Sequence, residues 1–341
     1  MDTYLMKKAM IEAAVTRGIR EMEEDPERSI RRLADLGRQF SKNRFQDQVF
    51  SIIQELLDNE NSAYYDMMHN LLKNSDHEAL RKFGVNFGYM SWAYGAATIR
   101  GLEKKEGFCI PWSIRLRYDA SESENPDAVN TEKLASLIEQ GQKLGIYVYF
   151  IRQSGSNTDS YALLELLGRY NDCAFVWFKE DGRLTAAQIQ MLKVCKNTVV
   201  SLPAGVHEAL LTSEILRDQK VIFAMHMLYD DNISDDQFHN VMEHVLTSET
   251  ALFFSISKDG TKNVARQYCY DSRLRQEYPC VEMDYYGDGE SISGVLAEHP
   301  YLLELDEYGR VVRPDGSKGT AFSFDLPLLE ALRQVMPPIE G

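Results

Sequence analysis

Polar residues that could form a ligand pocket lie at or just after the ends of short apolar segments. They are Asp119, Arg152, Gln153, Lys179, Glu180, His226 and Asp230. A general acid and base pair needs two titratable groups on neighbouring strand ends whose surroundings separate their pKa values. The sequence does not single out such a pair, because Lys179 and Glu180 are adjacent and indicate a solvated turn. The group therefore predicts a pocket and no defined catalytic residue.

Metal binding and nucleophilic catalysis have weak support in the sequence. His226 lies in the apolar run VIFAMHMLYDD, a position more typical of a hydrogen-bonded core histidine than of a ligand or base. His226, Asp230 and Asp231 lack the spacing of known metal sites, and His239 and His244 are too far apart to share a helix face. The sequence has no P-loop, Rossmann fingerprint or serine nucleophile elbow. We expect no metal site.

The cysteines indicate buried, reduced thiols. They are Cys109, Cys173, Cys195, Cys269 and Cys280. An odd number at irregular spacing, without a C-x2-C pair, fits neither a disulfide framework nor a common metal motif.

Composition and charge exclude several kinds of partner. The 341 residues are 44% hydrophobic, which is ordinary for a globular protein, and the formal net charge is −15. This charge opposes binding to nucleic acid or anionic membranes, which requires lysine and arginine to neutralise phosphates. The amino terminus predicts a charged amphipathic helix without the hydrophobic region of a signal peptide, and the sequence has no run long enough to span a bilayer. We expect a cytoplasmic protein, with its oligomeric state left open.

Residues 1–105 predict an all-α region. Apolar residues recur at helical spacing around Ile11–Met22, Ile30–Leu36, Phe45–Leu56 and Tyr65–Leu72. Asp25, followed by Pro26, and Asp76 are typical residues for helix starts. The aromatic residues that follow are expected to pack against the next domain: Tyr89, Trp92 and Tyr94.

Residues 106–341 predict alternating strands and helices. Strands are expected from residue 110 to Asp119 and at 147–151, 174–178, 199–202, 221–228 and 251–256. Helices are expected at 132–144, 161–169, 186–194, 208–216 and 235–246, two of them opened by the capping boxes Thr185–Gln188 and Ser234–Gln237. Strands joined by such helices run parallel and can close into a full or partial (β/α) barrel. A β-hairpin is expected at 301–314, with its turn at 306–309.

Several segments resemble radical S-adenosylmethionine (SAM) proteins, a family common in bacteria in which a helical region precedes a partial TIM-type barrel. IPWSIRLRYDASESENPD, residues 110–127, is similar to the family's first barrel strand and cluster loop. EEDPERSIRRLADLGRQFSKN and NLLKNSDHEALRKFGVNFGY are similar to its helical region, and LIEQGQKLGIYVYFI to its first barrel helix and second strand. The resemblance covers nearly the whole chain and implies an α/β fold: a partial barrel, preceded by helices and followed by a hairpin.

The motifs that bind the cluster and SAM in that family are missing here. In the family, three cysteines in a C-x3-C-x2-C arrangement hold a four-iron four-sulfur cluster, but the loop in this chain has no thiol to replace them. RQSGS, residues 152–156, stands where the family has a GGE-type motif for the SAM amino group. Val295 and Pro314 are the apparent equivalents of further cluster cysteines. The family-like segment that persists is Asp288, Gly289 and Glu290.

The resemblance therefore implies a degenerate radical SAM-like protein, a pseudoenzyme without an iron–sulfur cluster. Such a protein would act by binding a peptide or protein, or an active radical SAM paralogue. No cofactor is expected. One alternative is an enzyme of another class that uses the barrel mouth, with SAM or a nucleotide as its ligand. A second is a regulatory adaptor that works through the helical region.

Overall fold

Branched and aromatic segments form a largely parallel sheet. The computed structural model describes residues 3–24, 59, 61–122, 125–154, 160–230, 233–258, 264–297, 299–313 and 317–339. Its strands are β1 (Ser113–Asp119), β2 (Val148–Ser154), β3 (Ala174–Lys179), β4 (Thr198–Pro203), β5 (Phe223–Tyr229), β6 (Leu252–Ser257), β7 (Val281–Asp284), β8 (Leu303–Leu305), β9 (Arg310–Val312) and β10 (Lys318–Ala321). The order is β10-β9-β8-β1-β2-β3-β4-β5-β6-β7, parallel from β8 to β7. The predicted partial barrel is therefore confirmed.

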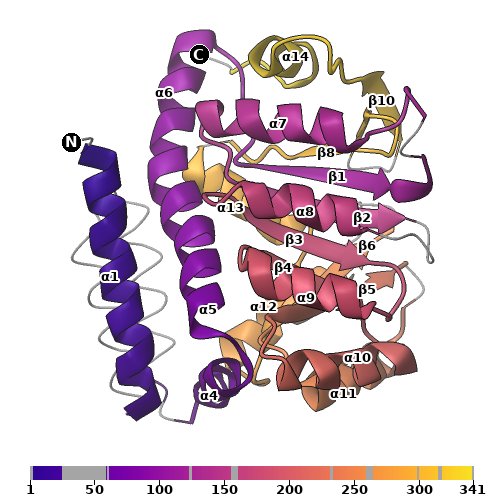
Figure 1. The fold of residues 1–341 in the computed structure, drawn as a ribbon. Coiled ribbons are helices and arrows are strands. Elements are labelled where there is room, and N and C mark those ends of the chain that lie inside the picture. Colours follow the sequence, from indigo (N-terminus) through magenta and orange to yellow (C-terminus); the bar gives the residue numbers. More distant parts are fainter. Residues whose placement is uncertain are drawn as a thin grey trace.

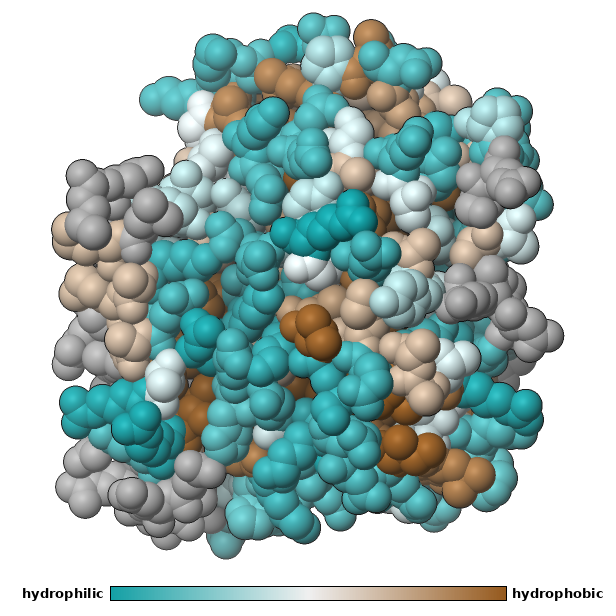
Figure 2. Space-filling view, in the orientation of Figure 1, coloured by the Kyte–Doolittle hydropathy of each residue, from teal (hydrophilic) through white to brown (hydrophobic). Residues whose placement is uncertain are grey.

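Helices alternate with the parallel strands, and those between β1 and β7 cover the outside of the sheet. They are α7 (Thr131–Leu144), α8 (Tyr161–Arg169), α9 (Ala186–Cys195), α10 (His207–Asp218), α11 (Asp235–Ser248), α12 (Val264–Arg275), α13 (Gly287–Leu296) and α14 (Leu328–Val335), with a short 3-10 turn, η2 (Ala120–Glu122), after β1. In Figure 1, α7, α8 and α9 lie side by side on one face of the sheet. Figure 2 shows this face as mostly hydrophilic, with hydrophobic residues in small separate groups.

Local signals in the sequence fix where several elements begin. Both predicted capping boxes are confirmed, at α9 and at α11. In the first, the Thr185 hydroxyl accepts from the Gln188 backbone N–H at 3.2 Å, and the Gln188 side chain accepts from the Thr185 N–H at 2.8 Å. The hairpin between β8 and β9 is also confirmed, and Gly309 occupies the left-handed region of its turn with φ of 71°.

Helices stand across the amino-terminal end of the barrel. They are α1 (Thr3–Glu24), α4 (Tyr64–Asn74) and a continuous helix made of α5 (His77–Gly84), the π-helical η1 (Val85–Gly95) and α6 (Ala96–Glu106). Figure 1 places α5 and α6 where the strands begin, with α1 outside them. The predicted cap at Asp76 is confirmed, because its carboxylate accepts from the Ala79 N–H at 2.8 Å. The other predicted helices, around Ile30–Leu36 and Phe45–Leu56, lie outside the described residues, as do Asp25 and Pro26.

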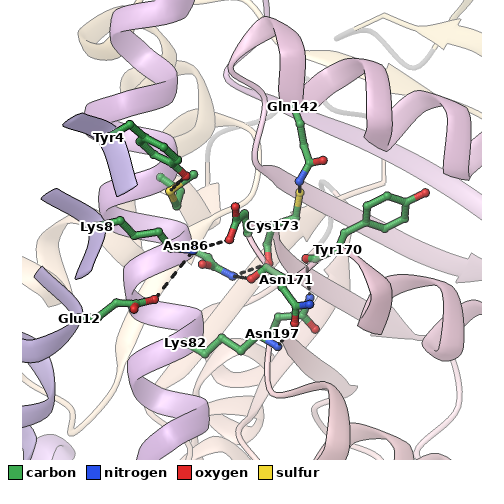
Figure 3. A network of polar contacts seen from close by, with 12 residues as sticks. Tyr4, Lys8, Glu12, Lys82, Asn86, Gln142, Tyr170, Asn171, Cys173 and Asn197 are labelled. Carbon is green, nitrogen blue, oxygen red and sulfur yellow. Dashed lines mark hydrogen bonds and ion pairs between the residues drawn. The ribbon is translucent and has the colours of Figure 1, made fainter. Parts of the chain in front are cut away.

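Polar contacts join this helical region to the barrel (Figure 3). Asn86 of η1 donates to the backbone oxygens of Asn171 and Cys173, just before β3, at 2.7 and 2.8 Å. Lys82 donates to the Asn171 side chain and to the Cys195 backbone oxygen at 2.7 and 2.9 Å. Lys8 of α1 pairs with Asp172. The bond from Asn86 to the Cys173 oxygen is fully buried, so it satisfies a carbonyl group just before β3 that water does not reach.

Aromatic residues of η1 pack on the same end of the barrel, as the sequence predicted. Trp92 contacts Phe87 with 5.4 Å between ring centroids, and Phe87 meets Trp112, which precedes β1, edge-on at 6.2 Å. Tyr94 lies between Tyr4 and Tyr147, at 4.2 and 6.0 Å. Among the described helices, none combines the length and the hydrophobicity needed to cross a lipid bilayer.

A close backbone approach fixes the position of η1 against the barrel. A Cβ atom at Gly95 would lie 2.2 Å from the backbone oxygen of Gly145, which precedes β2. Gly145 itself has φ of 92°, and a Cβ there would lie 2.6 Å from the Gly95 oxygen. Only residues without a side chain allow the two segments to meet at this distance.

Candidate functional site

Aromatic rings fill the lower part of the barrel interior. Side chains alternate across each strand, so neighbours in register share a face. Phe150 of β2 and Phe178 of β3 point inward, where they meet Phe254 of β6 and Tyr285, which follows β7. The ring centroids of Phe178 lie 5.3 Å from Phe254 and 5.5 Å from Tyr285. This layer closes the barrel beneath its mouth.

Arg115 of β1 is buried within this aromatic layer. Its side chain is 1% exposed, and its Cζ atom lies 4.2 Å from the centroid of the Tyr285 ring and 5.5 Å from that of Phe150. Its Nε and Nη1 atoms have no hydrogen-bond partner among the described residues. Gly289 of α13 borders the guanidinium, and a Cβ there would lie 1.8 Å from Nη2. The aromatic faces thus hold the cation in place of an ion pair.

A second layer of charged residues lies above the rings, at the carboxyl ends of β1 and β2. Arg117 and Arg152 are direct partners in the register of these strands, so their side chains share the inward face. The Glu304 carboxylate of β8 is 4% exposed, and its Oε1 atom lies 3.4 Å from Arg117 Nε and 3.7 Å from Arg152 Nη1. Its Oε2 atom accepts from the Tyr286 hydroxyl at 2.8 Å. Glu304 raises the pKa of Arg117 against the opposing effect of burial.

A cavity of about 600 Å³ opens at the carboxyl ends of β4 and β5. Three of the predicted pocket residues line it: Glu180, His226 and Asp230. Its apolar wall is formed by Pro203, Leu228, Ile233 and Val241. Asp230 pairs with Lys258 across its rim at 3.5 Å, and both side chains are about half exposed. The cavity therefore combines an apolar wall with charged side chains at a solvent-exposed rim.

His226 is the buried polar group of this cavity. Its Nδ1 atom lies 3.0 Å from the Ser201 hydroxyl, and its ring meets Phe178 edge-on at 5.3 Å. Burial, helped by the charge of Arg152, lowers the pKa of His226 to about 3. The imidazole is therefore neutral at physiological pH. Its hydrogen bond and burial are those of the core histidine that the sequence favoured.

The other predicted pocket residues lie elsewhere. Gln153 points toward α8, where its side-chain oxygen accepts from Trp177 Nε1 at 3.0 Å and from the Ser160 hydroxyl. Lys179 shares the outward face of Trp177, and its ammonium lies 5.4 Å from that ring. The interpretation of Lys179 as part of a solvated turn is wrong, because it is 4% exposed and pairs with Asp181 at 3.0 Å. Side chains alternate between the two faces of a strand, which is why Gln153 and Lys179 point outward and not into the barrel mouth.

Asp119 and the segment 288–290 make contacts within the protein and do not line the cavity. Asp119 closes the turn after β1 by accepting from the backbone and hydroxyl of Ser121 at 2.9 and 2.6 Å. Asp288 forms a bidentate pair with Arg273 at 2.6 and 2.8 Å. The backbone oxygen of Gly289 accepts from Trp112 Nε1 at 3.3 Å, and Glu290 lies 4.0 Å from Arg266.

None of the thiols lies at the barrel mouth. All five cysteines fall within the described residues, and all are free and buried. Cys109, Cys173 and Cys280 precede β1, β3 and β7, Cys195 ends α9, and Cys269 lies within α12. Burial raises the pKa of each thiol, to about 11 for Cys109 and about 12 for Cys269. These residues do not fit an iron–sulfur cluster, because the loop after β1 offers no thiolate.

Groups of potential metal-binding side chains were considered across the described residues. No group of three or more His, Cys, Asp or Glu side chains in the described part of the chain could hold a metal ion. Four polar residues inside the barrel were not predicted from the sequence: Arg115, Arg117, Tyr286 and Glu304. The alternation of arginine in SIRLRYD was the available signal, because it places Arg115 and Arg117 on one face of β1.

Two solved structures share the fold of this chain. SuiB from Streptococcus suis bound to S-adenosylmethionine is similar with a TM-score of 0.50 and 11% identity, over 67% of this chain and 65% of that chain. SuiB bound to the precursor peptide SuiA is similar with a TM-score of 0.51 and 12% identity, over 67% and 66%. The match thus spans slightly less than two thirds of the SuiB chain. A scan against protein-family models and a search of curated proteins found no match.

Proposed function

We propose that this protein is a radical SAM-like binding protein without an iron–sulfur cluster. It binds a peptide segment at the barrel mouth, carried by a peptide, a protein or an active radical SAM paralogue. The observation that carries this proposal is the placement of its thiols. Each cysteine is buried at a strand start or on a helix, away from the loop after β1. A cluster needs thiolates, and raised thiol pKa values oppose their formation.

The mouth offers features suited to a peptide rather than to a radical reaction. The aromatic layer of Phe150, Phe178, Phe254 and Tyr285 occupies the space beneath it. The cavity beside it, about 600 Å³ in volume, is within the usual size of ligand pockets and has an apolar wall that includes Leu228. Leu228 is 39% exposed although it belongs to a barrel strand. The likeness to SuiB bound to a precursor peptide supports a peptide as the ligand.

Two measurements test the proposal. Calorimetry with SAM separates it from an enzyme that keeps SAM as its ligand, and we expect no heat of binding. A random peptide library displayed on phage should yield sequences that bind the full chain. We expect Leu228→Arg, which places a charge in the cavity, to weaken their binding about tenfold or more.

Leu211→Arg is the matched control. Leu211 lies on α10 and is 48% exposed, so the substitution adds the same charge at another exposed leucine. Peptides that bind both variants equally, or micromolar binding of SAM in the absence of any selected peptide, would contradict the proposal.

A further inference from the structure

Positive charge is concentrated at one side of the barrel mouth in an otherwise acidic chain. Arg117 and Arg152 face inward there and share Glu304 as an ion-pair partner, with the buried Arg115 beneath them. The chain as a whole carries a formal charge of −15. Two guanidinium groups around one paired carboxylate leave a local excess of positive charge, with Glu307 as a further carboxylate that acts on Arg117. A recess with walls of low dielectric strengthens the attraction of such an excess for anions.

The hydrogen bonds of this group leave donors available. Glu304 uses Oε1 for both arginines and Oε2 for the Tyr286 hydroxyl. Arg152 reaches Oε1 only at 3.7 Å, which is beyond hydrogen-bond distance, and it makes no hydrogen bond within the described part of the chain. Its side chain is 17% exposed and that of Arg117 is 29% exposed. A ligand at the mouth can therefore reach both guanidinium groups.

The strand register also favours binding of an anion at this position. Arg117 and Arg152 are lateral partners on adjacent parallel strands, and like charges in this position repel each other. Arg152 also lowers the pKa of His226, so its field extends toward the neighbouring cavity. Glu304 compensates this repulsion in part, and a second anion beside the two guanidinium groups would satisfy the open donors. Guanidinium groups bind carboxylates and phosphates through paired hydrogen bonds.

We propose that Arg117 and Arg152 bind an oxyanion, a carboxylate or phosphate group, of the peptide that occupies the barrel mouth. This inference rests on the proposed function and names the chemistry of its ligand. The apolar cavity at β4 and β5 takes a side chain of that peptide, and the arginine pair at β1 and β2 takes its anionic group. The binding partner is thus an acidic or phosphorylated peptide.

Calorimetry with two small probes tests this inference on the full chain in a buffer low in chloride. The probes are inorganic phosphate and glutarate, and we expect one of them to bind at a single site. Tighter binding of phosphate assigns a phosphate group, and tighter binding of glutarate assigns a carboxylate. Arg152→Gln should weaken binding of the preferred probe about tenfold or more.

Arg183→Gln is the matched control, because Arg183 is 76% exposed and pairs with Glu208 on the surface. It should bind the probe as the wild type does. Thermal unfolding without the probe should show that Arg152→Gln is folded, since Glu304 keeps Arg117 as its partner. Absence of binding by both probes, or equal binding by Arg152→Gln, would overturn the inference. The proposed function would fail independently, if the selected peptides bound Leu228→Arg as tightly as Leu211→Arg.

Discussion

Replacement of Glu304 by glutamine tests how much its negative charge contributes to the stability of the folded protein. The glutamine side chain keeps an oxygen that can accept from the Tyr286 hydroxyl, but it removes the negative charge between Arg117 and Arg152. The two guanidinium groups then face each other in a recess where Glu304 is 4% exposed. Their repulsion is no longer compensated, so the folded state should lose stability.

The size of the loss follows from burial. Removal of one partner from a fully buried ion pair costs about 3–5 kcal/mol. Arg117 and Arg152 are 29% and 17% exposed, so water screens part of the repulsion. We therefore expect Glu304→Gln to lower the free energy of unfolding by about 2–3 kcal/mol. Glu290→Gln is the control, because Glu290 lies 4.0 Å from Arg266 with both side chains partly exposed. Its effect should stay within about 0.5 kcal/mol.

Urea unfolding with and without phosphate provides the assay. Phosphate should stabilise Glu304→Gln more than the wild type, because an anion between the arginines replaces the lost carboxylate and ligand binding to the folded state adds to stability. Equal stability of Glu304→Gln and the wild type would refute the account of the charge layer. A phosphate effect of the same size in both proteins would refute the role of the arginine pair in anion binding.

Three further predictions concern titration and packing. The pKa of His226 is about 3 when folded and about 6.5 when unfolded, so stability should fall as pH drops from about 6.5 toward 3, by up to ~1.4 kcal/mol per pH unit. Urea unfolding across this range should show a shallower pH dependence for His226→Gln, and an unchanged one would argue against a neutral buried imidazole. Burial raises the pKa of the folded Glu282 carboxyl to about 7. The stability that the protonated carboxyl contributes is fully present below pH 4.5 and is lost as pH rises through 7. Glu282→Gln should therefore be more stable than the wild type at pH 8 and similar to it at pH 4.5; a destabilised variant at pH 8 would contradict this. Gly95→Ala should lower stability by about 2 kcal/mol or more, because its Cβ would lie 2.2 Å from the Gly145 oxygen, whereas Gly101→Ala, which meets no atom within 4 Å, should not.

The sequence predicted the barrel because its signals were local. Capping residues at Thr185, Ser234 and Asp76 and continuous branched segments set helix starts and strands independently of distant contacts. The strand β7 and the helix α12 were not predicted. β7 is only four residues long and alternates with the polar Glu282 and Asp284, and α12 has few apolar residues. The packing of α12 against β7 depends on tertiary contacts that the periodicity of the sequence does not reveal.

The candidate site could be predicted only in part. Position after a strand indicated Glu180, His226 and Asp230, which do line one cavity. It did not distinguish the inward Arg152 from the outward Gln153, because the two faces depend on the exact strand register. Glu304 comes from β8, far along the chain, and only the parallel pairing of β8 with β1 brings it to the arginines. No residue spacing in the sequence predicts the contact between Glu304 and the two arginines.

Anaerobic reconstitution measures whether this barrel can hold an iron–sulfur cluster without thiolate ligands in the loop after β1. The full chain is incubated with ferrous iron and sulfide, desalted, and measured by visible absorption together with bound iron and sulfide. We expect no charge-transfer band and iron far below a cluster per chain. A stable four-iron cluster in stoichiometric amount would contradict the account.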